Sequence, residues 1–161
     1  RGVAAVDGVD ITPQMLASAR SKAIYRTLIQ AEISATGLDP LSYEICSMAL
    51  ADEHQADLAP VYREAERLLA PGGAFVLIGY HPFFLMNGLP THYHRADGSA
   101  VTIKSFVHLF SAHFAVGGAA GLSLNEFKEC VIDEAWLVSK PKWRKYLHWP
   151  VSFVLVWRKP G

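Results

Sequence analysis

Short apolar segments alternate with helix-forming segments through the first half of the 161-residue chain, and this alternation most constrains its fold. Each apolar segment is of strand length, and they lie at residues 3–9, 27–31, 43–48 and 74–80. Between the last two, residues 57–70 carry apolar side chains at 3.6-residue spacing, which is typical of a helix with one buried face. Strand, helix and strand joined by short turns predict an α/β fold whose mostly parallel sheet is covered on both faces.

Local signals mark where two of these helices begin and end. Thr12 is suited to the N-cap position, and Pro13 to the first turn of the helix that follows. The Pro71-Gly72-Gly73 sequence ends the helix at 57–70 and turns the chain into the strand at 74–80. These boundaries make the first 80 residues one continuous α/β unit.

The second half of the chain has a different pattern. Residues 91–104 predict a hairpin that turns at Asp97-Gly98, and Ser105 predicts the N-cap of a helix rich in phenylalanine. Three glycines between 117 and 121 weaken and end that helix. Residues 122–132 and 151–159 are then expected to form two further strands, joined by an aromatic-rich connection.

The composition excludes several classes of function. The net charge is zero and only 19% of residues are charged, so the chain lacks the positive charge that nucleic-acid binding requires. Its apolar stretches are too short to cross a membrane. Cys46 and Cys130 both lie in apolar runs, which predicts buried free thiols and a reducing, cytoplasmic location.

Several polar residues come directly at or after the predicted ends of strands, where open α/β sheets bind their ligands. Asp10 ends the first strand, and a carboxylate there can accept hydrogen bonds from the two hydroxyls of a ribose. Ile11 can pack on a purine ring, and Glu32, after the second strand, can accept from an exocyclic amine. Together they predict a cofactor that contains adenosine.

A purely structural role for Asp10 remains open at this point. Aspartate is common where a strand turns into a helix, because its side chain accepts hydrogen bonds from free backbone N–H groups. Thr12 is the better cap in this segment, so we expect Asp10 to be less engaged in the turn.

Three segments, "VDGVDITPQMLASARSK", "YEICSMALADEH" and "DLAPVYREAERLLAPGGAFVLIGYHP", resemble the class I S-adenosylmethionine-dependent methyltransferases. The likeness is to the small-molecule group with a G-x-D-x-[ST]-x-x-M-L turn, and it runs from about Val3 to Pro82. It implies a Rossmann-like sheet of seven strands in the order 3-2-1-4-5-7-6, with the segment at 151–159 as the antiparallel strand. We expect a single domain, 1–161, with a cofactor-binding half (1–80), a substrate-side insertion or lid (81–121) and C-terminal strands (122–161).

The resemblance also implies roles for particular residues. Asp10 would bind the ribose hydroxyls of S-adenosylmethionine, and Ile11 would pack on the adenine. Glu32 and Ile33 would contact the adenine amine. Ser47 and Met48 would line the methionine end of the cofactor. The implied reaction is in-line transfer of the methyl group to a small molecule.

One part of the family pattern has no counterpart in the sequence. The family's first strand and its Gly-rich loop are absent, and that strand is the central one, between the segments at 3–9 and 43–48. We therefore expect an N-terminally incomplete domain that binds S-adenosylmethionine poorly by itself. Two alternatives are that another chain supplies the strand in a homo-oligomer, or that the two flanking strands pair directly.

Five of the seven histidines lie between residues 81 and 113. His92 and His94 have a spacing that could bind a metal, but no third ligand is recognisable, so no metal is predicted. His81 follows a strand whose end faces the substrate side, and it is the candidate general base.

Two rival functions remain: a nicotinamide-dependent oxidoreductase, and a non-catalytic methyltransferase-like scaffold subunit.

Overall fold

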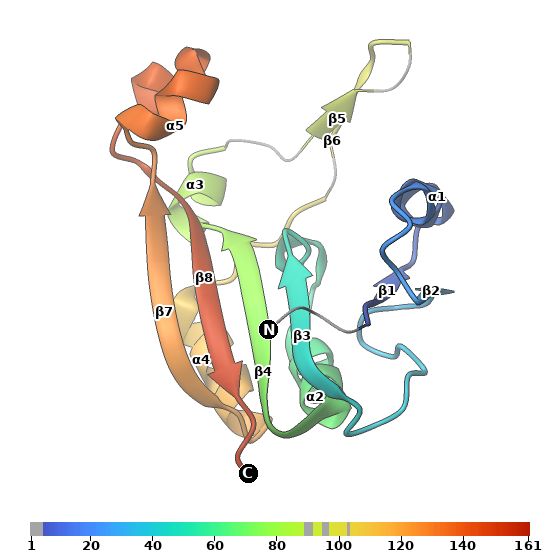
Figure 1. Cartoon of the computed structure of the whole chain (residues 1–161). Coiled ribbons are helices and arrows are strands. Elements are labelled where there is room, and N and C mark those ends of the chain that lie inside the picture. Colours follow the sequence, from blue (N-terminus) through green and yellow to red (C-terminus); the bar gives the residue numbers. More distant parts are fainter. Residues whose placement is uncertain (1–4, 89–91, 95–96, 103) are drawn as a thin grey trace.

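The largest element of the computed structural model is a four-stranded sheet; the structure describes residues 5–88, 92–94, 97–102 and 104–161 (Figure 1). Its strand order is β3-β4-β8-β7. The bounds are Tyr43–Ala49 for β3, Leu69–Tyr80 for β4, Pro150–Arg158 for β8 and Ser123–Val131 for β7. β3 and β4 are parallel, whereas β8 is antiparallel to both of its neighbours, as predicted for the segment at 151–159.

A second, two-stranded parallel sheet stands beside the β3 edge (Figure 1). It consists of β1 (Asp7–Asp10) and β2 (Thr27–Gln30), joined by the helix α1 (Pro13–Ser21). β1 is not hydrogen-bonded to β3, so the alternative in which the two flanking strands pair directly is wrong. The observed order matches the expected one, with no described strand between β1 and β3.

The helices α2 (Ala59–Leu68) and α4 (Phe110–Ala119) cover one face of the four-stranded sheet (Figure 1). The buried cluster on that face includes apolar side chains of β4 and β8, listed here: Phe75, Leu77, Phe153, Leu155 and Trp157. Tyr62 of α2 packs edge-on against two of these rings, 5.4 Å from Phe75 and 5.6 Å from Trp157 between centroids. The 3.6-residue pattern of α2 therefore buries one helix face as predicted, but the helix begins two residues later and ends two residues earlier than expected. The prediction that Pro71-Gly72-Gly73 ends the helix is wrong, because β4 already begins at Leu69 and includes these residues.

Shorter elements gather near the carboxyl ends of the parallel strands. Their bounds are Asp52–His54 for the 3-10 helix η1, Pro82–Met86 for α3, His92–His94 for β5, Ala100–Thr102 for β6, Glu134–Ser139 for α5 and Pro141–Tyr146 for η2. β5 and β6 form the predicted hairpin. The side chains of its two histidines lie outside what the structure describes. No helix in the described part of the chain is long and apolar enough to span a membrane.

Two further expectations need correction. The phenylalanine-rich helix begins at Phe110, not at Ser105, because the preceding residues bond to the segment after β3 instead. The Phe106 N–H donates to the Glu53 carbonyl at 2.7 Å, and the His108 ring bonds to the Gln55 carbonyl. Cys46 and Cys130 are free but only partly buried; burial raises the pKa of the Cys46 thiol to about 11.

Two adjacent glycines of α4 provide a matched test of this packing. A Cβ at Gly117 would lie 2.4 Å from the Trp157 ring, whereas a Cβ at Gly118 would meet nothing within 4 Å. We expect Gly117→Ala to lower the free energy of unfolding by about 1–3 kcal/mol through overpacking. Gly118→Ala should raise it by about 0.5–1 kcal/mol, because alanine favours helix. Urea denaturation measures both, and equal effects would contradict this packing of α4.

Candidate functional site

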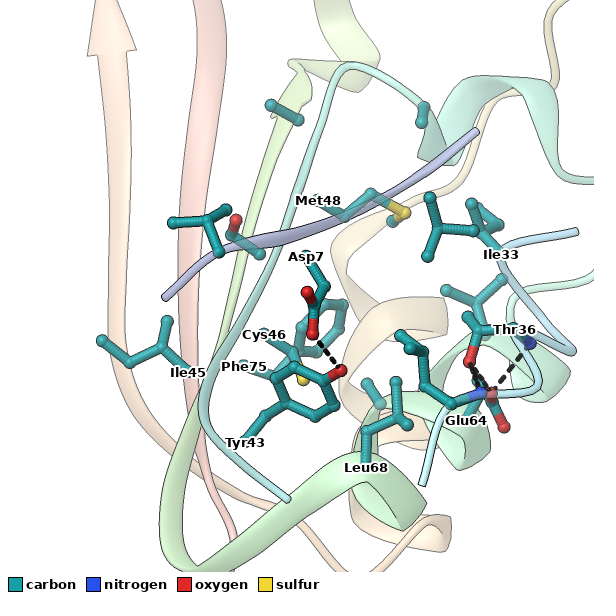
Figure 2. A pocket seen from close by; sticks show the side chains of 18 of the residues that line it. Asp7, Ile33, Thr36, Tyr43, Ile45, Cys46, Met48, Glu64, Leu68 and Phe75 are labelled. Carbon is teal, nitrogen blue, oxygen red and sulfur yellow. Dashed lines mark hydrogen bonds between the residues drawn. The ribbon is translucent and has the colours of Figure 1, made fainter. Parts of the chain in front are cut away.

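A pocket of about 470 Å³ lies between β1 and β3 (Figure 2). Three groups make up most of its lining: residues of β1 and the segment before it (Ala5, Val6, Asp7, Val9, Asp10), residues of β3 and the segment after it (Tyr43, Ile45, Cys46, Ser47, Met48, Ala49, Ala51), and residues of α2 and β4 (Val61, Glu64, Ala65, Leu68, Phe75). Ile33, Thr36 and Leu38 complete it. The pocket therefore joins the ends of two strands that do not pair.

Asp10 lies half-buried at the end of β1 and lines this pocket. Its Oδ1 accepts a hydrogen bond from the Thr12 N–H at 2.7 Å. Thr12 occupies the predicted N-cap position, but its side chain makes no capping hydrogen bond. The expectation that Thr12 would relieve Asp10 of structural work is therefore wrong: Asp10 holds the turn with one oxygen. Its Oδ2 makes no hydrogen bond within the part of the chain that the structure describes.

The structure brings some of the predicted cofactor residues together and leaves others apart. Ile33, Ser47 and Met48 line the same pocket as Asp10. Ile11 is 54% exposed and does not line it. Glu32 is also exposed and outside the lining, and its only strand-like pairing is a backbone bridge to Ala35.

The other end of the pocket is held by an ionic contact that sequence reasoning missed. Arg26 binds the Asp7 carboxylate through Nε, at 3.0 Å, and through Nη2. The Tyr43 hydroxyl donates to Asp7 Oδ2 at 2.7 Å (Figure 2). The hydrogen bond from Arg26 lowers the pKa of Asp7 to about 2. Asp7 and Tyr43 are the first residues of their strands, so β1 and β3 begin at the same end of the pocket. The only signal for this contact was an acid and a base at the starts of adjacent strands.

A second polar contact lies in the wall made by α2. Glu64 accepts hydrogen bonds from the Thr36 N–H at 2.9 Å and from the Thr36 hydroxyl (Figure 2). Arg67 donates to Glu64 Oε2 at 2.8 Å. These partners, Arg67 above all, lower the pKa of Glu64 to about 2. Both carboxylates deep in the pocket, Asp7 and Glu64, are thus already paired, which leaves Asp10 as the pocket's available acid.

His81 is buried and does not line the pocket. Its Nδ1 accepts a hydrogen bond from the Phe83 N–H at 3.1 Å and so caps α3. Its Nε2 lies 2.8 Å from Oε1 of Glu129, which fixes the tautomer with the proton on Nε2. Neither ring nitrogen offers a free lone pair, so this geometry favours a structural role over the predicted one as general base.

Directly after the pocket-lining Ala51, three buried titratable residues come together. Asp52 is 3% exposed and Glu53 1%, and His113 Nε2 lies 3.6 Å from Asp52 Oδ2. Burial, with the neighbouring Glu53 carboxylate, raises the pKa of Asp52 to about 7. Burial, with His108 nearby, lowers the pKa of His113 to about 4. Among the described residues, no group of three or more His, Cys, Asp or Glu side chains is placed to hold a metal ion.

Comparison with known proteins gives this geometry a context. Residues 1–77 match the family model of the methyltransferase domain. A S-adenosylmethionine-dependent methyltransferase from Mesorhizobium loti superposes with a TM-score of 0.78 at 20% identity, over 98% of this chain and 82% of that one. A S-adenosylmethionine-dependent methyltransferase from Clostridium acetobutylicum superposes with a TM-score of 0.74 at 11% identity, over 98% of this chain and 76% of that one.

A third similar structure, from Haloferax volcanii, is a methyltransferase in complex with the methyltransferase activator Trm112. It gives a TM-score of 0.72 at 16% identity, over 100% of this chain and 74% of that one. None of the curated proteins is significantly similar to this chain. The fold of the whole chain is therefore that of these methyltransferases, as the sequence pattern predicted.

The buried Asp52 gives the protein a pH dependence that can be measured. In the folded state this carboxyl stays protonated up to about pH 7, whereas in the unfolded chain it ionises near pH 4. Between these values the unfolded chain binds fewer protons, so ionisation of Asp52 lowers the free energy of unfolding as pH rises. The free energy of unfolding of Asp52→Asn, relative to that of wild type, should therefore rise by on the order of a few kcal/mol from pH 4 to pH 7, and it should not rise further above pH 7.

Urea denaturation at a series of pH values checks this, with Glu126→Gln as the control at an exposed position. A wild-type minus Asp52→Asn difference that does not vary with pH would refute the assignment. His113 acts in the opposite sense between about pH 4 and 6.5, so only the difference between variants isolates Asp52.

Proposed function

We propose that this chain, which has the fold of the class I S-adenosylmethionine-dependent methyltransferases and matches the methyltransferase-domain family over its first 77 residues, transfers a methyl group from S-adenosylmethionine to a small molecule. The observation that carries the proposal is the position of Asp10. Its carboxylate ends β1 and faces the same pocket as Ser47 and Met48 at the end of β3.

The donor set around Asp10 fits the adenosine part of the cofactor. Oδ2 of Asp10, which has no hydrogen-bond partner among the described residues, can accept from a ribose hydroxyl, and Oδ1 can accept a second hydrogen bond beside that from Thr12. Ile11 is exposed next to it and can pack on one face of the adenine. In this proposal Ile33 supports the ring from within the pocket, and Glu32, the preceding residue, accepts from the exocyclic amine.

Residues at the end of β3 face the methionine part in this proposal. The Ser47 hydroxyl can bond to the amino or carboxylate group, and the Met48 side chain gives apolar contact to the chain that bears the sulfur. The bound cofactor would supply an electrophilic methyl group on a positively charged sulfur. The protein's task is then to hold the acceptor in line with the methyl carbon and to exclude water.

The proposed reaction needs no dedicated base if the acceptor is a good nucleophile, because positioning alone supplies much of the rate. This agrees with the engaged ring nitrogens of His81. The zero net charge of the chain supports a small-molecule acceptor, because binding of a nucleic acid requires an excess of positive charge. Residues 81–121, which include the β5–β6 hairpin, are the proposed substrate-side lid.

Substitution of Asp10 tests the proposal with a matched control. Asp10→Asn keeps an oxygen to accept from the Thr12 N–H but replaces the second acceptor with a donor. We expect the affinity for S-adenosylmethionine in the encoded protein, measured by calorimetry, to fall about 10- to 100-fold. Asp57 makes the same kind of turn, to the Ala59 N–H at 2.9 Å, but lies outside the pocket, so Asp57→Asn should leave affinity unchanged.

Thermal shifts separate the rival functions in the same protein. S-adenosylmethionine should raise the melting temperature and NAD should not, because only a ligand of the folded state stabilises it. An NAD shift without one from S-adenosylmethionine would favour the oxidoreductase. Unchanged cofactor affinity in Asp10→Asn would contradict the assigned site and favour the scaffold subunit.

A further inference from the structure

The segment between β2 and β3 carries Glu32 and Ile33, and it has little apolar packing of its own. Of residues 31–42, only Thr36 is buried, at 6% exposure. Ile33 is partly buried in the pocket lining, and Glu32 is exposed. Because apolar burial does not fix this segment, its position depends on the polar contacts that Thr36 makes.

Glu64 on α2 supplies the long-range contact of Thr36. The Thr36 N–H and hydroxyl both donate to Glu64 Oε1, although the two residues are 28 positions apart in the sequence (Figure 2). Arg67 adds a second attachment, because its Nε donates to Glu64 Oε2 and its Nη2 donates to the Leu38 carbonyl at 2.8 Å. The segment is thus tied to α2 at both Thr36 and Leu38.

A short hydrogen-bonded turn connects Thr36 to the two proposed adenine residues. The Ala35 N–H donates to the Glu32 carbonyl at 3.0 Å, and these two residues also form an isolated β-bridge. Ile33 lies within this turn. A displacement of Thr36 therefore also displaces Glu32 and Ile33, because no flexible length of chain separates them from it.

The helix that carries Glu64 is firmly held. Its buried face includes the apolar residues Val61, Tyr62, Ala65 and Leu68. Glu64 is itself only 8% exposed, and a buried carboxylate is unfavourable unless donors surround it. An ion pair with Arg67 on the helix surface would stabilise α2 without burial, so the donors from Thr36 show that Glu64 does more than stabilise its own helix.

We propose that Glu64 is a positioning residue for recognition of the adenine base. It acts through Thr36, and it holds the turn on which Glu32 accepts from the exocyclic amine and Ile33 supports the ring. This inference rests on the proposed function and adds the support behind one part of the site. Groups that bind a ligand are selective only when their own positions are fixed by such contacts.

The ribose side of the proposed site is held independently of Glu64. The Ala31 N–H donates to the Asp10 carbonyl at 3.3 Å, and Gln30 Nε2 donates to the Ile11 carbonyl at 3.1 Å. Both hydrogen bonds join the end of β2 to the end of β1. Loss of the Glu64 contacts should therefore weaken recognition of the base and leave the contacts of Asp10 with the ribose in place.

Base selectivity of the encoded protein tests this proposal. S-inosylhomocysteine has a carbonyl oxygen where S-adenosylhomocysteine has the exocyclic amine, and both have the same ribose and amino-acid parts. Wild type should bind the adenosine compound at least tenfold more tightly, because the Glu32 carboxylate accepts from the amine and repels the oxygen. Glu64→Gln replaces one acceptor with an N–H donor, and in calorimetric titrations it should reduce this ratio about fivefold or more.

A second acid of α2 provides the matched control. Glu66 pairs with Lys159 at 2.8 Å and lies outside the pocket lining, so Glu66→Gln should leave the ratio unchanged. Thr36→Val removes the hydroxyl donor and keeps the backbone N–H. It should reduce the ratio about two- to fivefold, and it tests the proposal even where Glu64→Gln does not fold.

Hydrogen exchange of the ligand-free protein is the second readout. The Ala35 amide, which closes the turn, should exchange at least tenfold faster in Glu64→Gln than in Glu66→Gln, while the amides of β4 exchange equally in both. Equal weakening of the two ligands in Glu64→Gln, or equal exchange of Ala35, would overturn the proposal in favour of a purely structural role. Wild type that binds neither compound would contradict the proposed function itself, and this inference would fall with it.

Discussion

Backbone hydrogen bonding across the sheet is the constraint on which the rest of this structure depends. β3 and β1 each use one edge, with β4 and β2, and turn the other edge to the pocket between them. Polar contacts hold this part of the chain in place: Asp7 of β1 contacts Tyr43 of β3, and Thr36, after β2, contacts Glu64 of α2. The relative position of Asp10 and Ser47, and so the geometry of the proposed site, depends on these few contacts.

The other half of the molecule is far more strongly packed. β4 and β8 bury alternate side chains against α2 and α4, and Tyr62, Phe153 and Trp157 are almost fully buried there. The main sheet therefore provides a rigid wall that fixes the end of β3. The β3 side of the proposed site is therefore firmly positioned by apolar packing, whereas the position of its β1 side depends on hydrogen bonds.

Much of the fold could be predicted from the sequence because period and turn signals act locally. The spacing in α2, Pro13 at the start of α1 and the turn at Asp97-Gly98 each gave the right element. The start of α4 could not be predicted, because the competing partner of the Phe106 N–H is Glu53, more than fifty residues away. The link from Asp7 to Arg26 and Tyr43 was missed for the same reason: strand register is set by tertiary contacts.

Among the proposed site residues, too, some features could be predicted from the sequence and others depend on tertiary contacts. Asp10, Ile33, Ser47 and Met48 line one pocket, although β1 and β3 belong to two separate sheets. The roles of Thr12 and His81 depend on hydrogen bonds that only the folded chain reveals: Asp10 holds the turn in place of the threonine side chain, and the histidine caps α3. Sequence patterns thus selected four residues that line one pocket, but they did not show which of the proposed site residues were already hydrogen-bonded within the chain.

A crystal structure of the encoded protein with S-adenosylhomocysteine is the most direct test of the central claim. The account predicts ribose hydroxyls within hydrogen-bond distance of the Asp10 carboxylate, and the amino-acid part of the ligand beside Ser47 and Met48. A nucleoside bound away from the ends of β1 and β3, with Asp10 contacting only the backbone of its own turn, would contradict it.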